Sequence, residues 1–160
     1  MDIYEFAIQM EYEGQVYYQE LAEKTSNTGL KNILNMLADD EIKHQQAIEQ
    51  IRTTTCAMSD SAVLDKVENI FREMKESGGN VNLSGDEEKL YQHAMDLEQK
   101  SQSFYQEKAE EVETPEQKAL FSKLAEEERK HYQIMSNLVD FVAAPKTWLE
   151  DARFSHLDEY

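Results

Sequence analysis

The stretch LADDEIKH at residues 37–44 returns later in the chain as LAEEERKH at residues 124–131. Both stretches hold a Glu and a His three residues apart, so the two side chains share one face if the segment is helical. The pairs are Glu41 with His44 and Glu128 with His131. An offset of 87 residues, the separation of Glu41 and Glu128, relates the two copies and indicates a chain built from two similar halves.

A second pair of segments matches at the same offset. Residues 10–23 align with residues 97–110, and this alignment matches Glu11 with Glu98. Each of these glutamates precedes the Glu of its own Glu-x-x-His pair by 30 residues. Each half therefore supplies one lone Glu and one Glu-x-x-His, which is the ligand set of a di-metal carboxylate site in a four-helix bundle.

Apolar residues recur at helical spacing in four long segments, and the chain has only five Gly and two Pro. The pattern predicts an all-α fold in a single domain over residues 1–160, with helices at 2–25, 28–52, 85–112 and 115–143. Residues 53–83 carry a further amphipathic pattern, which predicts an extra helix within a long crossover. A long crossover between the second and third helices favours a ferritin-like topology. Residues 145–160 are expected to be a short C-terminal tail that packs on the bundle or on a second subunit.

The six Glu and His residues interrupt the apolar stripes of these helices at mid-length. An unpaired buried carboxylate is costly, so a carboxylate on such a stripe is usually paired, neutralised or bound to a metal. Two divalent ions would cancel the charge of four converging glutamates. Oxygen and imidazole ligands without thiolate suit Fe, Mn or Zn. The predicted metal ligands are Glu11, Glu41, His44, Glu98, Glu128 and His131.

Two tyrosines also recur at the same offset. Tyr18 and Tyr105 lie seven residues after Glu11 and Glu98, two helical turns along the same face. They are candidates to hydrogen-bond a ligand carboxylate or to carry proton or radical chemistry, and the alternative is two ordinary core tyrosines with satisfied hydroxyls.

Composition narrows the classes of partner and compartment. The net charge of −17 disfavours nucleic acid and anionic membranes, which would repel the protein. The single cysteine, Cys56, permits no intramolecular disulfide and no Cys-x-x-Cys metal site. The first residues lack the basic and apolar regions of a signal peptide, so the sequence predicts a cytoplasmic protein.

At these repeated residues the chain resembles the ferritin-like superfamily and, within it, the diiron domain of the rubrerythrin family, over about the first 142 residues. The resemblance implies a diiron centre held by the six residues above. It also implies reaction with peroxide or dioxygen, usually in a homodimer. Two features depart from the family. One cysteine cannot build the four-cysteine iron site of a rubredoxin domain, so electrons must come from an external donor. The turns next to Glu98 hold Met95 and Ser101, where rubrerythrins often carry one more ligand Glu, so the ligand set is closer to that of bacterioferritin-type ferroxidase centres.

The residues therefore predict an oxidoreductase of the rubrerythrin type, with electrons supplied from outside. Two alternatives from other classes remain at this point. One is a non-redox bundle that binds or handles iron. The other is a structural or regulatory bundle that Zn or Mn stabilises.

Overall fold

The protein is described from a computed structural model, which places residues 2–53, 70 and 85–143. These residues form four long α helices and contain no strand: α1 (Ile3–Lys24), α2 (Thr28–Thr53), α4 (Gly85–Glu111) and α5 (Pro115–Ala143). The predicted all-α fold is confirmed, and each helix boundary lies within one residue of the sequence prediction. None of the described helices combines the length and the apolar character that crossing a membrane requires.

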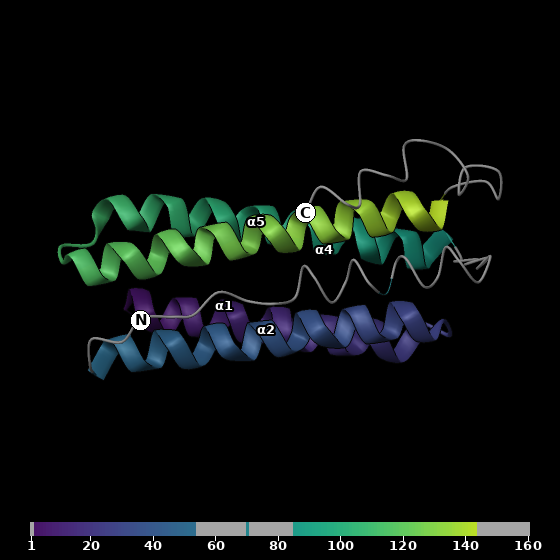
Figure 1. Cartoon of the computed structure of the whole chain (residues 1–160), viewed down its shortest axis with the longest axis horizontal. Helices are drawn as coiled ribbons and strands as arrows, with labels where there is room; N and C mark the ends of the chain where they lie inside the picture. Colours follow the sequence, from purple (N-terminus) through teal and green to yellow (C-terminus); the bar gives the residue numbers. More distant parts are fainter. Residues whose placement is uncertain (1, 54–69, 71–84, 144–160) are drawn as a thin grey trace.

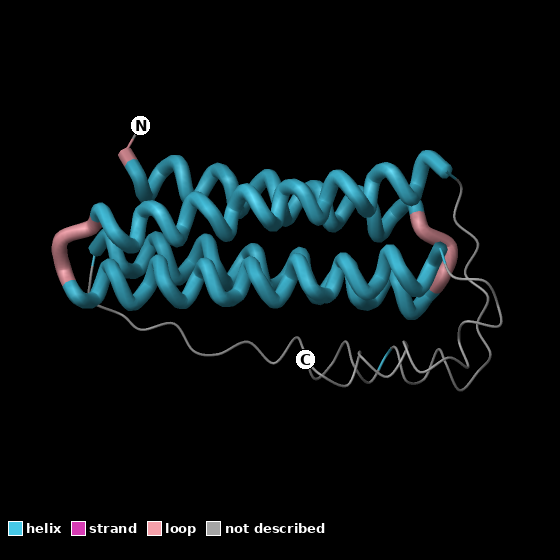
Figure 2. The backbone as a smooth tube through the Cα atoms, turned by 90° about the horizontal axis from the view of Figure 1, so that it is seen from above, coloured by secondary structure: helices cyan, strands magenta, loops and turns pink. Residues whose placement is uncertain are grey.

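The helices form two antiparallel pairs that lie against each other, α1 with α2 and α4 with α5 (Figure 1). The short turns that close the two pairs lie at opposite ends of the bundle (Figure 2). As a result α2 and α4 run in the same direction, and α2 ends at the end of the bundle opposite to where α4 begins. This is the ferritin-like arrangement, in which the second and third helices of the bundle are parallel.

Local capping explains where three of the helices begin. The Asp2 carboxylate accepts a hydrogen bond from the backbone N–H of Glu5 at 2.8 Å, and the Asn27 side chain accepts one from the N–H of Leu30 at 3.0 Å. Before α5, the Thr114 hydroxyl accepts from the N–H of Gln117 while the Gln117 side chain accepts from the N–H of Thr114. This reciprocal pair is a capping box.

The buried side chains fall into two apolar clusters along the bundle. One contains Leu34 and Leu138 with their neighbours, and the other contains Ile48 and Phe121 with theirs. On all four helices the stretch between the two clusters carries the predicted Glu and His ligands. The polar site therefore lies in the middle of the bundle, with an apolar core on each side.

Some sequence predictions fall outside the described residues. These are the extra helix predicted within residues 53–83, apart from Thr53 and Ile70, the environment of Cys56, and the tail at 145–160. Ile70 is helical and packs against the first apolar cluster. The assignment of the whole chain to one domain stays a prediction.

Candidate metal centre

The structure brings all six predicted ligands together in the centre of the bundle. Each helix supplies them from one stretch: Glu11 on α1, Glu41 and His44 on α2, Glu98 on α4, and Glu128 and His131 on α5. All six side chains are buried, none being more than 4% exposed. The apolar residues before and after each ligand fix the rotation of its helix, so the ligand can only point inward.

The six residues form two overlapping groups, each of which can surround one ion. The first is Glu11, Glu41, His44 and Glu128, and the second is Glu41, Glu98, Glu128 and His131; in each, the ligand atoms lie within 4.8 Å of one another. Glu41 and Glu128 belong to both groups, so each has a carboxylate within reach of two ion positions. We call the first group the Glu11 position and the second the Glu98 position.

The imidazoles take matching places in the two positions. Nδ1 of His44 lies 3.2 Å from Glu11 and 3.1 Å from Glu128. Nδ1 of His131 lies 2.8 Å from Glu41 and 3.5 Å from Glu98. The two rings are stacked, with centroids 5.6 Å apart. In both positions, therefore, the same ring nitrogen faces the carboxylates.

Burial and mutual charge divide the four glutamates into two kinds. Burial and the neighbouring carboxylates raise the pKa of Glu41 and Glu128 well above the ordinary value. Burial also acts to raise the pKa of Glu11, but the positive charge of His44 and the hydrogen bonds around Glu11 outweigh it and bring the pKa to about 2. The pKa of Glu98 is likewise lowered, because its hydrogen bonds and His131 outweigh burial. Without metal, protons therefore bind more readily to the two shared carboxyls than to the two lone glutamates.

Asp40 is a member of the site that the sequence analysis missed. Its carboxylate, only 3% exposed, lies 2.9 Å from Nε2 of His131. Burial alone would lower the pKa of His131, but the charge of Glu98 and the hydrogen bond to Asp40 raise it well above its ordinary value. A carboxylate on the outer ring nitrogen fixes the tautomer and the orientation of a histidine ligand. The alignment of the two halves could have pointed to Asp40, because it matches Asp40 with another acidic residue, Glu127. The structure shows that Glu127 is also buried.

The two predicted tyrosines contact the lone glutamates, each across the repeat. The Tyr18 hydroxyl of α1 donates to Glu98 of α4, and the Tyr105 hydroxyl of α4 donates to Glu11 of α1 at 2.5 Å. Burial and the nearby carboxylates raise the pKa of both phenols well above the ordinary value, so both remain protonated donors. Each tyrosine thus holds one lone glutamate in place.

The donor set fits two hard or borderline divalent ions. Oε2 of Glu98 and Oε1 of Glu128 are buried without a hydrogen-bond partner, although Oε1 of Glu128 lies 3.1 Å from Nδ1 of His44. Buried carboxylate oxygens of this kind are costly unless a cation reaches them. Space is also tight at Glu41, because a Cβ at Gly14 would lie 3.2 Å from its Oε2. Glycine at position 14 therefore lets α1 pass the Glu41 carboxylate without displacing it.

The fold and the site together define a ferritin-like bundle with a buried carboxylate–histidine centre. The family model described as rubrerythrin matches residues 2–139, and the chain belongs to the rubrerythrin family. Among solved structures, a hypothetical protein from Pyrococcus furiosus is similar, with a TM-score of 0.57 and 21% identity over 85% of each chain. At that identity the likeness supports the fold alone. No curated protein matches the chain.

Membership of the family confirms the resemblance seen in the sequence. It supports a metal centre of the diiron-carboxylate kind in this bundle. The family match does not specify the metal or the role of each ligand, so both are inferred from the donor atoms of the site.

Proposed function

We propose that this protein is a non-haem diiron-carboxylate oxidoreductase that reduces a peroxide or dioxygen with electrons from an external donor. The observation that carries the proposal is the pair of overlapping ligand groups that share Glu41 and Glu128. Two ions held by these groups would share ligands and could act on one small oxidant together. The rubrerythrin family favours iron, while the donor atoms would also accept Mn or Zn.

The bound ions would supply one electron each and would stabilise the negative charge that develops on the oxidant's oxygens. The residues of the chain position the ligands and hold protons. Tyr18 and Tyr105 fix the lone glutamates, and Asp40 holds His131 by its outer nitrogen. Hydrogen bonds to charged carboxylates contribute about 1.5–3 kcal/mol each, enough to keep a ligand in one orientation.

Proton supply also follows from the site. Glu41, Glu128 and His131 have raised pKa values before metal binds, so metal binding must release protons. The buried phenols of Tyr18 and Tyr105 keep their protons next to the carboxylates. Reduction of a peroxide consumes protons, and these hydroxyls are protein groups placed to relay them.

The test begins with metal analysis of protein purified without oxygen, followed by rapid mixing of the ferrous form with hydrogen peroxide. We expect about two iron ions per chain, fast oxidation, and repeated turnover when a reductant is added. Slow or absent oxidation would overturn the oxidoreductase proposal and favour a metal-handling or metal-stabilised bundle. A Glu126→Ala variant is the matched control, because Glu126 is exposed on α5 and pairs with Arg129 outside the site.

A further inference from the structure

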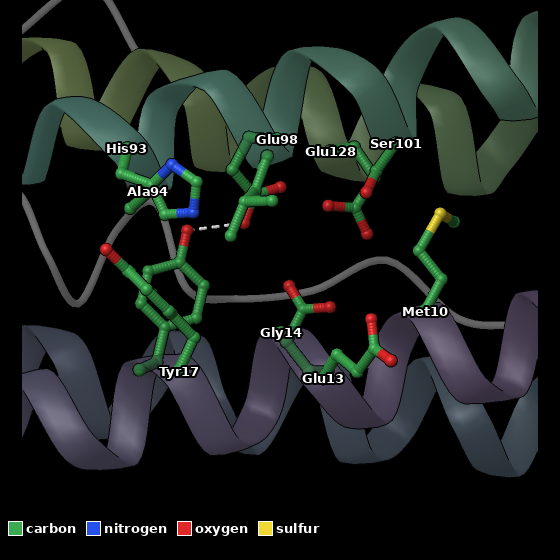
Figure 3. Close-up of a pocket in the computed structure, with 12 residues that line it drawn as sticks. Met10, Glu13, Gly14, Tyr17, His93, Ala94, Glu98, Ser101 and Glu128 are labelled. Carbon is green, nitrogen blue, oxygen red and sulfur yellow. Dashed lines mark hydrogen bonds between the residues drawn. The ribbon is translucent and has the colours of Figure 1, made fainter. Parts of the chain in front are cut away.

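A pocket of about 270 Å³ lies between α1 and α4 and reaches the candidate metal centre. Its inner surface includes the carboxylates of Glu41, Glu98 and Glu128. In Figure 3, Tyr17 and His93 lie toward one end of the pocket, and Met10 and Ser101 lie toward the other. The lining runs from the exposed Glu13 to the two shared carboxylates and to the lone glutamate of the Glu98 position.

The pocket is larger than the oxidants considered so far. About 10–15 Å³ of such space is enough to hold one water molecule, so the pocket has room for a ligand much larger than water or hydrogen peroxide. Met10, Ala94 and Leu97 give the pocket apolar surface, and three carboxylates line it at the metal centre. Other polar side chains line it elsewhere, namely Glu13, Tyr17, His93 and Ser101. Ligand pockets with apolar walls and a few convergent polar groups bind organic molecules that carry one polar end.

Both halves of the repeat line the pocket, but it reaches only one of two equivalent ring contacts between α1 and α4. The offset of 87 residues relates Tyr17 to Phe104 and His93 to Phe6. Both are ring contacts between α1 and α4: Tyr17 with His93 at 5.3 Å between centroids, and Phe6 with Phe104 at 5.0 Å. Tyr17 and His93 line the pocket, whereas Phe6 and Phe104 do not.

Aromatic rings packed around Phe104 fill the space on that side of the candidate metal centre. Phe104 also contacts the ring of Tyr105, with centroids 5.4 Å apart, and Tyr105 packs in turn on Phe121 at 5.8 Å. Tyr18, the counterpart of Tyr105, instead lines the pocket. One side of the centre is thus closed by aromatic packing, while the other presents a cavity with a polar floor.

We propose that this pocket binds an organic hydroperoxide, with its hydrocarbon group against Met10, Ala94 and Leu97 and its peroxide group toward Glu98 and Glu128. The proposal rests on the proposed function, whose oxidant it narrows to a class. The reaction balances as ROOH with two electrons and two protons giving ROH and water. The O–O bond would break, and the two electrons would come from two ferrous ions held by the proposed ligands, which would become ferric.

Ser101 offers a way to reduce the pocket without removing a proposed ligand. It lines the pocket and is half-buried, whereas Ser103 on the same helix is exposed and lies outside the lining. Ser101→Leu adds a branched side chain inside the pocket, and Ser103→Leu is the matched control. Met10→Phe narrows the opposite wall from α1 and serves if Ser101→Leu does not fold. Melting temperature and metal content are measured for every variant.

The binding test uses zinc-loaded protein, which cannot carry out the redox step, and 2-phenyl-2-propanol, the alcohol that corresponds to cumene hydroperoxide. Ligand-observed NMR titration gives the dissociation constant. We expect binding to the unmodified protein and to Ser103→Leu with similar constants, and at least fivefold weaker binding to Ser101→Leu or Met10→Phe. Absence of binding, or equal binding by all variants, would overturn the proposal.

The activity test compares kcat/KM for cumene hydroperoxide with kcat/KM for hydrogen peroxide in iron-loaded protein. We expect the ratio of the two to fall at least fivefold in Ser101→Leu and to stay within twofold in Ser103→Leu. Hydrogen peroxide reduction with no alcohol binding and no reduction of cumene hydroperoxide would refute this inference alone. Reduction of neither peroxide would refute the proposed function and, with it, the organic hydroperoxide as substrate.

Discussion

The bundle is filled around Tyr105 and hollow around Tyr18, although the two tyrosines occupy equivalent places in the repeat. Tyr105 packs on Phe104 and Phe121 and donates to Glu11, whereas Tyr18 donates to Glu98 and lines the pocket. The ligands of the Glu11 and Glu98 positions match residue for residue, but their surroundings do not. The repeat retains the proposed ligands, while the side chains around them differ, and the pocket reaches Glu98 but not Glu11.

The largest expected effect comes from removing what the two positions share. In Glu41→Ala combined with Glu128→Ala, both groups lose their common bridges, so the metal content should fall from about two ions per chain to near zero. The protein should also lose the stabilisation by metal, about 2.7 kcal/mol when free metal is at 100 times its dissociation constant. Metal analysis and melting temperature with and without added Zn measure these effects. Full metal content in the double variant would end the di-metal interpretation.

The next effect concerns pH and involves both positions at once. Glu41 and Glu128 have raised pKa values, so their protonated forms stabilise the metal-free fold fully below the ordinary value of 4.5, and this contribution is lost as the pH rises through the raised values. His131 acts in the same direction, with its contribution complete below 6.5. Glu11 acts in the opposite direction, because its contribution is present above 4.5 and is lost as the pH falls toward about 2.

We therefore expect the free energy of unfolding of the metal-free protein to decline as the pH rises from mildly acidic to alkaline. The metal-loaded protein should show the opposite trend, since protons compete with metal for the same ligands. Urea unfolding at a series of pH values, with a chelator or with Zn, measures both curves. Parallel curves would show that these residues are not the ligands.

A smaller effect should separate the two positions. Asp40 contacts Nε2 of His131 at 2.9 Å, so Asp40→Asn should weaken the Glu98 position in particular. Loss of such a partner typically costs about 10–100-fold in metal affinity. Calorimetric titration with Zn should then show one weakened site and one nearly unchanged site. Asp39→Asn is the control, because Asp39 is exposed, and equal weakening of both sites would contradict the assignment.

The smallest effect tests the difference between the packed surroundings of Tyr105 and the pocket beside Tyr18. Tyr105→Phe removes the hydroxyl that donates to Glu11 in a packed environment, and we expect a loss of about 2 kcal/mol in the free energy of unfolding. Tyr18→Phe should cost about half as much, because water can reach Glu98 through the pocket and replace the hydroxyl. Urea unfolding of the two zinc-loaded variants measures the difference. Equal losses would mean that the pocket gives Glu98 no such relief.

The helices and the six proposed ligands could be predicted because each depends on a local pattern. The apolar stripes fix which face of each helix is inside, and Glu11 or His131 on such a stripe has no other direction to take. The capping box at Thr114 likewise depends only on residues four positions apart or fewer. The offset of 87 residues then matched the two halves without any knowledge of their packing.

Asp40 and the pocket depend on packing between helices. Asp40 lies one residue before Glu41, at the edge of the inward face, and only the approach of α5 decides whether such a residue is buried or solvated. The alignment of Phe6 with His93 was visible in the sequence, but its meaning requires knowing that both face the α1–α4 contact. A repeat by itself predicts two equal halves, and the asymmetry arises from the few side chains that break it.

The two-fold repeat has a consequence for how such a centre can change over time. A single hairpin with one lone Glu and one Glu-x-x-His needs a second copy to surround two ions, and two identical copies would share a symmetry axis. In that arrangement any opening beside one ion is repeated beside the other. Once the two copies are joined in one chain, a substitution at residue 93 no longer changes residue 6. Duplication followed by divergence can therefore keep one side of the centre packed while the pocket on the other side changes to fit a particular ligand.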